Sequence, residues 1–293
     1  DSSGNRIGLQ DETGAITTYA YDPRNLLTSL TDLRTGTFVF QYDPLGRRTT
    51  LIRPNGTSTA YTYDAASRLT GLTHRGRWGP FEALTYTYDP AGNRTGDIRN
   101  RRAHQYSYDP LNQLTHVHAR HGENRWREQE GYTYDPVGNR LSGPHHQTYG
   151  FDASNRLTGD STHAYAYDNN GNLIEKRRLR DGRLTIYTYD AEDSLIRVVT
   201  PRTEVTFQYD PLGRRIEKRT LRWHDEDGDQ EPDPDEEGPS RITRYLYDQE
   251  DILATFNDSG REIARYTHGP GIDEPLTEVR RHRTRFYHAD VLG

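Results

Sequence analysis

A short unit of two aromatic residues and an aspartate recurs along the whole chain. Each copy has an aromatic ring, one intervening residue, a second ring and then aspartate, as in Tyr61-Thr62-Tyr63-Asp64. The aspartates of the eleven copies are Asp22, Asp43, Asp64, Asp89, Asp109, Asp135, Asp152, Asp168, Asp190, Asp210 and Asp248. A unit repeated this often restricts the chain to an architecture assembled from similar, neighbouring pieces.

The two rings of each copy predict a β-strand. Side chains two residues apart lie on the same face of a strand, so both rings of a copy are expected on one sheet face. The first rings are Tyr19, Phe40, Tyr61, Tyr86, Tyr106, Tyr132, Tyr149, Tyr165, Tyr187, Phe207 and Tyr245. The residue between the rings is small or polar in ten copies, Leu246 being the exception, which is the alternation of a half-buried strand.

The residues after each aspartate predict a tight turn. Proline follows the aspartate directly in six copies. The third residue after the aspartate is Gly, Asn, Asp or Ser, namely Asn25, Gly46, Ser67, Gly92, Asn112, Gly138, Asn155, Gly171, Asp193, Gly213 and Asp251. These are the preferences of a type I turn whose closing residue adopts the left-handed conformation. Each copy is therefore interpreted as one β-hairpin.

The predicted fold class is all-β, with consecutive hairpins pairing edge to edge into a sheet strip that curls because sheets twist. Only 31% of the residues are hydrophobic, yet the chain holds 21 Tyr, 7 Phe and 3 Trp. Its core is therefore expected to be built mainly from rings.

Composition also excludes several classes of protein. Without cysteine there is no disulfide, thiolate nucleophile or cysteine-based zinc site. A net charge of -6, with arginines that follow the repeat, argues against a nucleic-acid partner. No apolar run is long enough for a membrane span, and no signal peptide is visible. The chain begins at Asp1 and contains no methionine, so we expect it to be a piece of a longer polypeptide.

The repeats resemble a known family. The segments "YTYDAASRLTGLT", "YSYDPLNQLT" and "YTYDPVGNRL" look like the YD repeats of Rhs (rearrangement hotspot) proteins, teneurins and the shell components of Tc-type toxins. "RYTHGPGIDEPL" (265–276) and "YHADVLG" (287–293) are similar to the Rhs core segment near the end of the repeat region.

The resemblance implies a sheet strip spiralling into a hollow shell that encloses a C-terminal toxin or effector domain of the same polypeptide. It implies a secreted or cell-surface location, with secretion-system or cell-surface partners. Some relatives cut themselves within a later D-P-x-G-L-like segment. The two "DPLG" copies here are followed by Arg47 and Arg214 and lie in ordinary repeats, so neither protease residues nor a toxin activity is carried over.

Candidate chemistry was weighed against structural roles. One aspartate per turn fits turn formation better than catalysis, and two rings per strand fit wall packing better than sugar stacking. His116 and His118 share a strand face with His121 beyond, a spacing able to hold zinc, but no further ligand is predictable. His145 and His146 are expected to face solvent.

One composition break divides the chain. Residues 223–240 are expected to form an acidic loop in which Asp225, Asp227 and Asp229 faintly resemble a calcium loop. Clustered acid with Pro and Gly is more often a solvated loop, and calcium binding by 225–237 stays open. The expected organisation is a hairpin array over 1–222, this loop insertion over 223–240, and a final repeat with the start of the core segment over 241–293.

Three functions were compared. The first is the structural shell of an Rhs-type toxin or effector. The alternative is an extracellular adhesion module that binds carbohydrate or a partner through exposed rings. A hydrolase ranks last because no catalytic motif is present, so the protein is predicted not to be an enzyme. No catalytic, cofactor-binding or metal residue is assigned, and no cofactor is expected.

Overall fold

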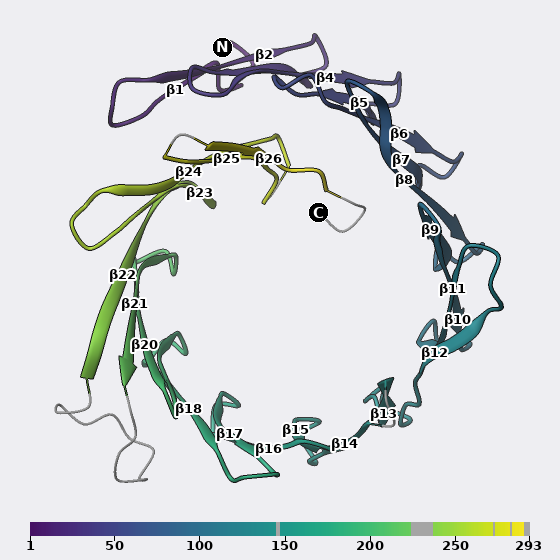
Figure 1. The fold of residues 1–293 in the computed structure, drawn as a ribbon, viewed down its shortest axis with the longest axis vertical. Coiled ribbons are helices and arrows are strands. Elements are labelled where there is room, and N and C mark those ends of the chain that lie inside the picture. Colours follow the sequence, from purple (N-terminus) through teal and green to yellow (C-terminus); the bar gives the residue numbers. More distant parts are fainter. Residues whose placement is uncertain (145–146, 224–236, 272, 282, 290–293) are drawn as a thin grey trace. The chain divides into compact units, whose positions relative to one another are not determined.

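The computed structural model describes residues 1–144, 147–223, 237–271, 273–281 and 283–289, and within them every regular element is a strand (Figure 1). The first sheet contains β1 (Gly8–Gln10), β2 (Ile16–Tyr21), β3 (Leu27–Asp32), β4 (Gly36–Tyr42), β5 (Arg48–Ile52), β6 (Ser58–Tyr63), β7 (Leu69–Gly76), β8 (Gly79–Tyr88), β9 (Arg94–Arg99), β10 (Arg102–Tyr108), β11 (Leu114–His121) and β12 (Arg127–Gly131).

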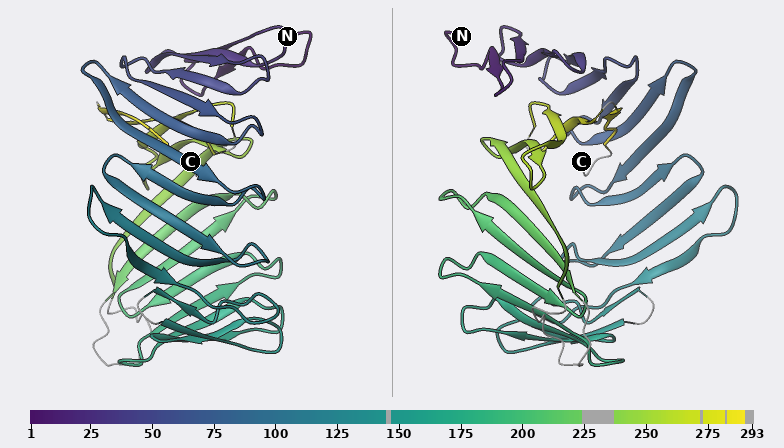
Figure 2. Two further views of the ribbon diagram at one scale, coloured as in Figure 1. Left: turned by 90° about the vertical axis from the view of Figure 1, so that its right-hand side faces the viewer. Right: turned by 60° about the vertical axis from the view of Figure 1, so that its left-hand side comes forward.

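The second sheet is built in the same way from the rest of the chain. It contains β13 (Ser142–Gly143), β14 (Gln147–Phe151), β15 (Leu157–Asp160), β16 (His163–Tyr167), β17 (Leu173–Arg178), β18 (Leu184–Tyr189), β19 (Leu195–Thr200), β20 (Thr203–Tyr209), β21 (Arg215–Trp223), β22 (Glu237–Asp248), β23 (Asp251–Phe256), β24 (Glu262–His268), β25 (Pro275–Arg280) and β26 (Arg283–Phe286). In both sheets each strand pairs with the next one in sequence, and the resolved registers are antiparallel. The predicted all-β array of consecutive hairpins is confirmed, and Figure 2 shows the strands running side by side.

The repeated turn has the predicted geometry. In the copy at Asp43, the register shifts between Gln41 and Tyr42, and Gly46 has φ of +78°. The residue in this position is left-handed in ten copies, from Asn25 to Gly213. Such a bulged hairpin needs one residue with positive φ, which explains the choice of Gly, Asn, Ser or Asp.

The eleventh copy departs from the prediction. The sequence predicts Asp251 as the left-handed turn residue, but Asp251 pairs with Asp248 and begins β23. The turn contains only Gln249 and Glu250, and Gln249 has φ of +52°. A two-residue connection replaces the bulged turn here, so Asp251 was assigned wrongly.

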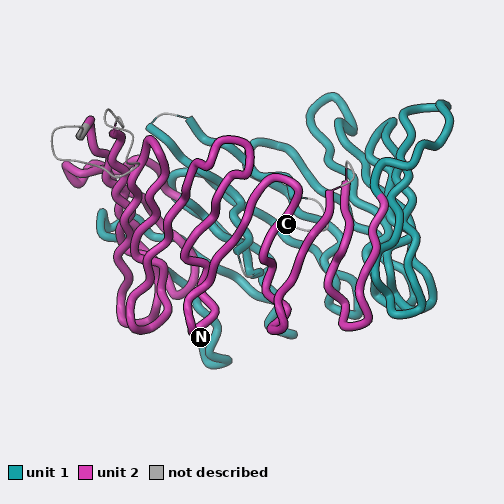
Figure 3. Tube along the Cα trace, turned by 90° about the horizontal axis from the view of Figure 1, so that it is seen from below, with its two compact units in different colours: residues 1–130, 266–293 teal, residues 131–265 magenta. Residues whose placement is uncertain are grey.

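The chain divides into two compact units, each described here by itself (Figure 3). Unit 1 contains Asp1–Glu130 and Tyr266–Gly293, and unit 2 contains Gly131–Arg265. The division at 1–222, 223–240 and 241–293 stays a prediction. The acidic residues Asp225, Asp227 and Asp229 lie outside the described residues, as do His145 and His146.

The main core lies in unit 1. Leu27, Leu30, Phe38, Phe40 and Leu51, from β3–β5, are at most 4% exposed. Leu276 of β25 belongs to the same cluster, and Tyr19, Tyr21, Tyr42, Tyr61 and Phe286 pack against it. Tyr19 and Tyr21 therefore lie on one face, as the ring spacing predicts. Within the described ranges, no helix is long and apolar enough to cross a membrane.

Candidate functional site: the repeat turns and the C-terminal strap

The repeated aspartates organise their own turns. Asp64 Oδ1 accepts the backbone amides of Ala66 and Arg68, each at 2.9 Å, while Oδ2 accepts Arg68 Nε at 2.6 Å. The pKa of Asp64 is lowered, first by the hydrogen bond from the amide of Arg68. Burial raises this pKa, but the amide bond and the bond from the Arg68 guanidinium together outweigh it. The predicted turn role of the aspartates is therefore seen directly in their contacts.

The residue four positions after the aspartate links consecutive turns. Arg47 Nη1 donates to the carbonyl of Asp64 at 3.0 Å, and Arg68 Nη1 donates to the carbonyl of Asp89 at 2.7 Å. Where this position is Asn, the amide group makes the link, as from Asn93 to Asn112 at 2.7 Å. The sequence interpretation missed these residues, although Arg or Asn at this spacing was a visible signal.

In seven copies the second ring fastens one hairpin to the preceding one. The hydroxyl of Tyr42 donates to the carbonyl of Leu27 at 3.0 Å, and that of Tyr209 donates to the carbonyl of Leu195 at 2.7 Å. The same bond is made by Tyr63, Tyr88, Tyr108, Tyr167 and Tyr247. This hydroxyl explains why the second ring is almost always Tyr, whereas the first ring is Phe at 40 and 207.

Residues 266–289, which we call the C-terminal strap, lie on the aromatic face of unit 1. Leu276 is 2% exposed within the cluster of Leu30 and Phe38, and the ring centroids of Phe286 and Phe38 are 6.3 Å apart. Figure 1 shows β25 and β26 alongside the first strands of this unit. The strap therefore covers a face that would otherwise expose large apolar side chains.

Polar contacts fix the strap at three further places. Arg48 and Glu274 form an ion pair, with Nη2 donating to Oε2 at 3.0 Å. Arg53 Nε donates to the carbonyl of Tyr287 at 3.0 Å. Thr267 donates to buried Asp32 at 3.1 Å. Because both partners of the Arg48–Glu274 pair are largely shielded from water, removing either one would leave the other charge without compensation.

The strap also contains a buried carboxylate of its own. Glu278 is 3% exposed and accepts Arg280 Nη2 at 2.7 Å, Arg285 Nη1 at 3.3 Å and the Tyr266 hydroxyl at 3.3 Å. Two cations and a phenol satisfy a charge that would be costly to bury alone. These contacts hold β24, β25 and β26 together.

Two histidines meet where the end of the strap reaches β6–β8. His74 of β7 is 1% exposed, and its ring centroid lies 4.9 Å from that of His288. Phe81 packs against both rings, at 5.9 Å from His74 and 5.2 Å from His288. Burial, then the charge of Arg53, then His74 lower the pKa of His288 to about 4. The sequence interpretation did not single out either histidine.

The histidines that it did consider as metal ligands lie elsewhere, on β11. His116 and His118 stack with ring centroids 6.2 Å apart, and His116 and His121 are exposed. In the part of the chain that the structure describes, no three His, Asp or Glu side chains gather closely enough to hold a metal ion.

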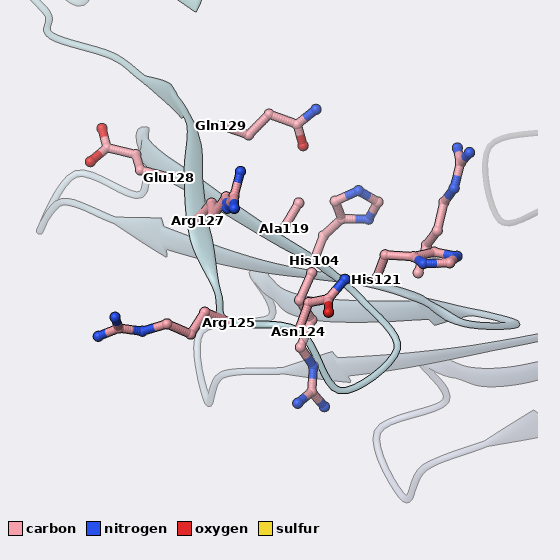
Figure 4. A pocket seen from close by; sticks show the side chains of 10 residues that line it. His104, Ala119, His121, Asn124, Arg125, Arg127, Glu128 and Gln129 are labelled. Atoms are coloured by element: carbon pink, nitrogen blue, oxygen red, sulfur yellow. The ribbon is translucent and has the colours of Figure 1, made fainter.

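An open pocket of about 820 Å³ lies at β10–β12 in unit 1 (Figure 4). Its lining includes four arginines, at 102, 120, 125 and 127, together with His104 and His121. Figure 4 shows Arg125 and Glu128 on the side of β12 away from His104 and His121. The guanidinium of Arg125 therefore does not converge with His104 and His121 on one point, as recognition of an anion by this group would require.

Two family models match the chain. The model described as "Teneurin YD-shell" matches residues 97–224, and that described as "RHS Repeat" matches residues 42–77. Both matched ranges consist of the hairpin repeats described above.

Curated relatives match the same repeats. "Probable deoxyribonuclease RhsB" of Dickeya dadantii is 30% identical over 203 residues, which cover 68% of this chain and 12% of that protein. "Double-stranded DNA deaminase toxin A" of Burkholderia cenocepacia is 35% identical over 139 residues, covering 45% of this chain and 9% of the relative. The chain thus spans about an eighth or less of the length of these relatives.

Solved structures with a similar course of the chain include a Tc holotoxin pore of Photorhabdus luminescens. It is 16% identical, with 92% of this chain and 17% of that chain covered and a TM-score of 0.48. The repeat register, the two matching family models and the curated relatives agree, and the chain belongs to the RHS/YD-repeat family.

Proposed function

We propose that this chain is part of the wall of an RHS-type shell, and that the shell encloses a toxin or effector domain of the same polypeptide. The observation that carries the proposal is the strap on the aromatic face of unit 1. Because the strap ends on that face, polypeptide following it would start on the side of the rings rather than on the opposite, polar side.

The role of the wall is mechanical. Continuous pairing of neighbouring hairpins leaves few open strand edges, and the bonds between consecutive turns join adjacent hairpins. Such a wall acts by keeping partners and proteases away from what it surrounds. In this proposal the chain itself is not an enzyme, and the activities named for its relatives would belong to domains outside the shared repeats.

The names of the relatives support this reading. One is called a toxin and another a deoxyribonuclease, and the chain matches only a small share of each. Export, with a secreted or cell-surface location and partners in a secretion system or on a cell surface, is part of the same proposal.

Protease protection tests the proposal. A small protease-sensitive reporter is fused after Gly293, and its cleavage is compared with that of the same reporter fused before Asp1. We expect the C-terminal fusion to be cut at least about tenfold more slowly, because its reporter is held on the aromatic face. Equal rates for the two fusions would remove the basis for enclosure.

One observation favours the alternative, a binding module. Trp78, in the connection between β7 and β8, is 91% exposed. The guanidinium of Arg77 stacks on its ring, 5.0 Å from the ring centroid. An exposed indole is typical of surfaces that contact sugars or proteins. A glycan array and a pull-down with the Trp78→Ala variant as control separate the two functions: binding lost only in the variant would favour recognition.

A further inference from the structure

The end of the C-terminal strap is held by a hydrogen-bond network that contains a buried arginine and two histidines. Arg53 Nη1 donates to the hydroxyl of Thr59 at 2.8 Å, and that hydroxyl lies 2.9 Å from His74 Nδ1. His74 also bonds to the backbone of Ala289 in the strap; this bond raises the pKa of His74, but burial and the charge of Arg53 lower it by more. The network assigns the proton of His74 to Nε2, facing the carbonyl of Ala289, and leaves Nδ1 as an acceptor for Thr59.

His288 completes the network from the strap. Its Nδ1 lies 3.4 Å from Nδ1 of His74, and its Nε2 lies 3.5 Å from the hydroxyl of Thr57. Protons on both rings would place two imidazolium charges with ring centroids 4.9 Å apart beside the buried guanidinium of Arg53, and a proton on His74 Nδ1 would point at His288. Protonation of either ring therefore opposes the docked arrangement.

The surrounding charges act in the same direction. Arg53 is 3% exposed and lies close enough to lower the pKa of both histidines, after the larger effect of burial. Arg99 also lowers the pKa of His74. Glu82 is the carboxylate that opposes this effect at both histidines, and Arg99 Nε already donates to it at 2.6 Å. Asp290 lies outside the described residues.

We propose that the C-terminal strap is a pH-sensitive switch, docked on β6–β8 while His74 and His288 are neutral and released when they are protonated. A histidine whose pKa is depressed on docking stabilises the docked state fully above its undocked pKa and progressively less as the pH falls toward its docked pKa. With an undocked value of about 6.5, the useful window lies below neutral pH. The proposal concerns the strap alone and holds whether or not the shell encloses a cargo.

The expected size of the effect follows from linkage. A docked pKa near 4 for His288, against about 6.5 undocked, makes docking about 30-fold weaker at pH 5 than at pH 7.5. Protonation of His74 would add to this loss.

Hydrogen exchange of the whole chain measures the release. Peptides covering 273–289 are followed from pH 7.5 to pH 5, with exchange corrected for its intrinsic pH dependence and β16–β20 of unit 2 as the internal reference. We expect the strap to lose protection about 30-fold while the reference stays protected. Unchanged protection of the strap, or parallel loss in the reference, would overturn the proposal.

Two variants identify the residue responsible. His288→Phe keeps a ring beside Phe81 but cannot be protonated, so the pH dependence of strap exchange should shrink. The matched control His116→Phe, at an exposed position of β11, should keep the full dependence. The same dependence in His288→Phe as in the unaltered chain would refute the switch. If His288→Phe leaves the strap open at pH 7.5, the ring-proton titration of the unaltered chain decides: an ordinary pKa for His288 would also refute it.

Discussion

Ten nearly identical residues occur in both units, and their surroundings differ. Residues 40–49 and 207–216 share the sequence FQYDPLGRR, and they form the same turn. In each, the arginine after the turn binds the aspartate: Arg47 Nε lies 2.6 Å from Asp43, and Arg214 Nε lies 2.8 Å from Asp210. Each copy is therefore complete as a local structure.

The difference is what covers the first ring. Phe40 is 2% exposed in the cluster that includes Leu276 of the strap, whereas Phe207 is only partly buried. Arg48 and Arg215 each stack on the phenylalanine of their own copy, at 5.2 and 4.6 Å from the ring centroid. Only Arg48 is also paired with Glu274. The local sequence sets the hairpin, and a segment more than 200 residues away sets its burial.

The largest expected difference between the copies is the cost of removing the ring. Phe40→Ala should lower the free energy of unfolding of unit 1 by about 3–5 kcal/mol, because it opens a cavity in a closed core. Phe207→Ala should cost unit 2 about 1–2 kcal/mol, since water already reaches that ring. Native-state hydrogen exchange reports each unit separately. Equal costs would contradict the comparison.

The ion pair of the strap should be worth less than the ring but more than an exposed pair. Glu274→Gln leaves Arg48 without its counter-charge in a shielded site, which should cost unit 1 about 2 kcal/mol. The matched change Glu217→Gln, in the more exposed pair with Arg244, should cost about 0.5 kcal/mol. Denaturant unfolding, followed by hydrogen exchange in each unit, measures the change in free energy of unfolding for both variants. A larger decrease for Glu217→Gln than for Glu274→Gln would contradict this ranking.

The turn aspartates should behave alike in the two units. Asp43→Ala and Asp210→Ala remove the same set of acceptors for backbone amides and arginine, so each unit should be destabilised to a similar extent. Comparison of the two urea midpoints checks this. A much larger effect at Asp43 would mean that the strap also depends on the turn.

Removing the tyrosine hydroxyls should have a small effect, again equal in both copies. Tyr42→Phe and Tyr209→Phe each remove one bond to a backbone carbonyl, which should cost about 1 kcal/mol. Tyr19→Phe, at a first ring, is the control that keeps this inter-hairpin bond. A loss confined to one unit would show that the bond is not a general feature of the repeat.

Acid should remove the turn contribution from both units together. Bonds from the Arg68 and Arg156 amides are the largest influence on Asp64 and Asp152, whose pKa values are lowered. The carboxylates therefore stabilise the fold above their unfolded pKa, and this contribution is lost as the pH falls below about 4. Acid unfolding followed by exchange should show both units affected in this range, and loss in only one would contradict a shared turn mechanism.

Much of the fold could be predicted because it is local. Ring spacing, proline and left-handed turn residues determine each hairpin within about ten residues, and consecutive hairpins need no long-range information to pair. The link through Arg68 was also visible in the repeat but needed the turn geometry to be recognised. The exception at Asp251 arose because the spacing of polar residues does not distinguish a bulged turn from a two-residue turn.

The strap could not be predicted in the same way. Its contacts join Arg48 to Glu274, Arg53 to Tyr287 and His74 to His288, across more than 200 residues and without any repeat. Nothing in the local pattern around His74 marks it as buried, and the motif at 287–293 indicated a family rather than a contact. Contacts between residues so far apart in the sequence cannot be inferred from local spacing alone.

A mutant cycle on the strap tests the central claim most directly. In a chain ending at His268, strand content is first checked by circular dichroism, and the cost of Phe40→Ala is then measured as in the complete chain. We expect the decrease in free energy of unfolding caused by Phe40→Ala to fall to that caused by Phe207→Ala, because the strap closes the core over Phe40. A cost that stays about 3–5 kcal/mol without the strap would show that the hairpins bury the ring by themselves.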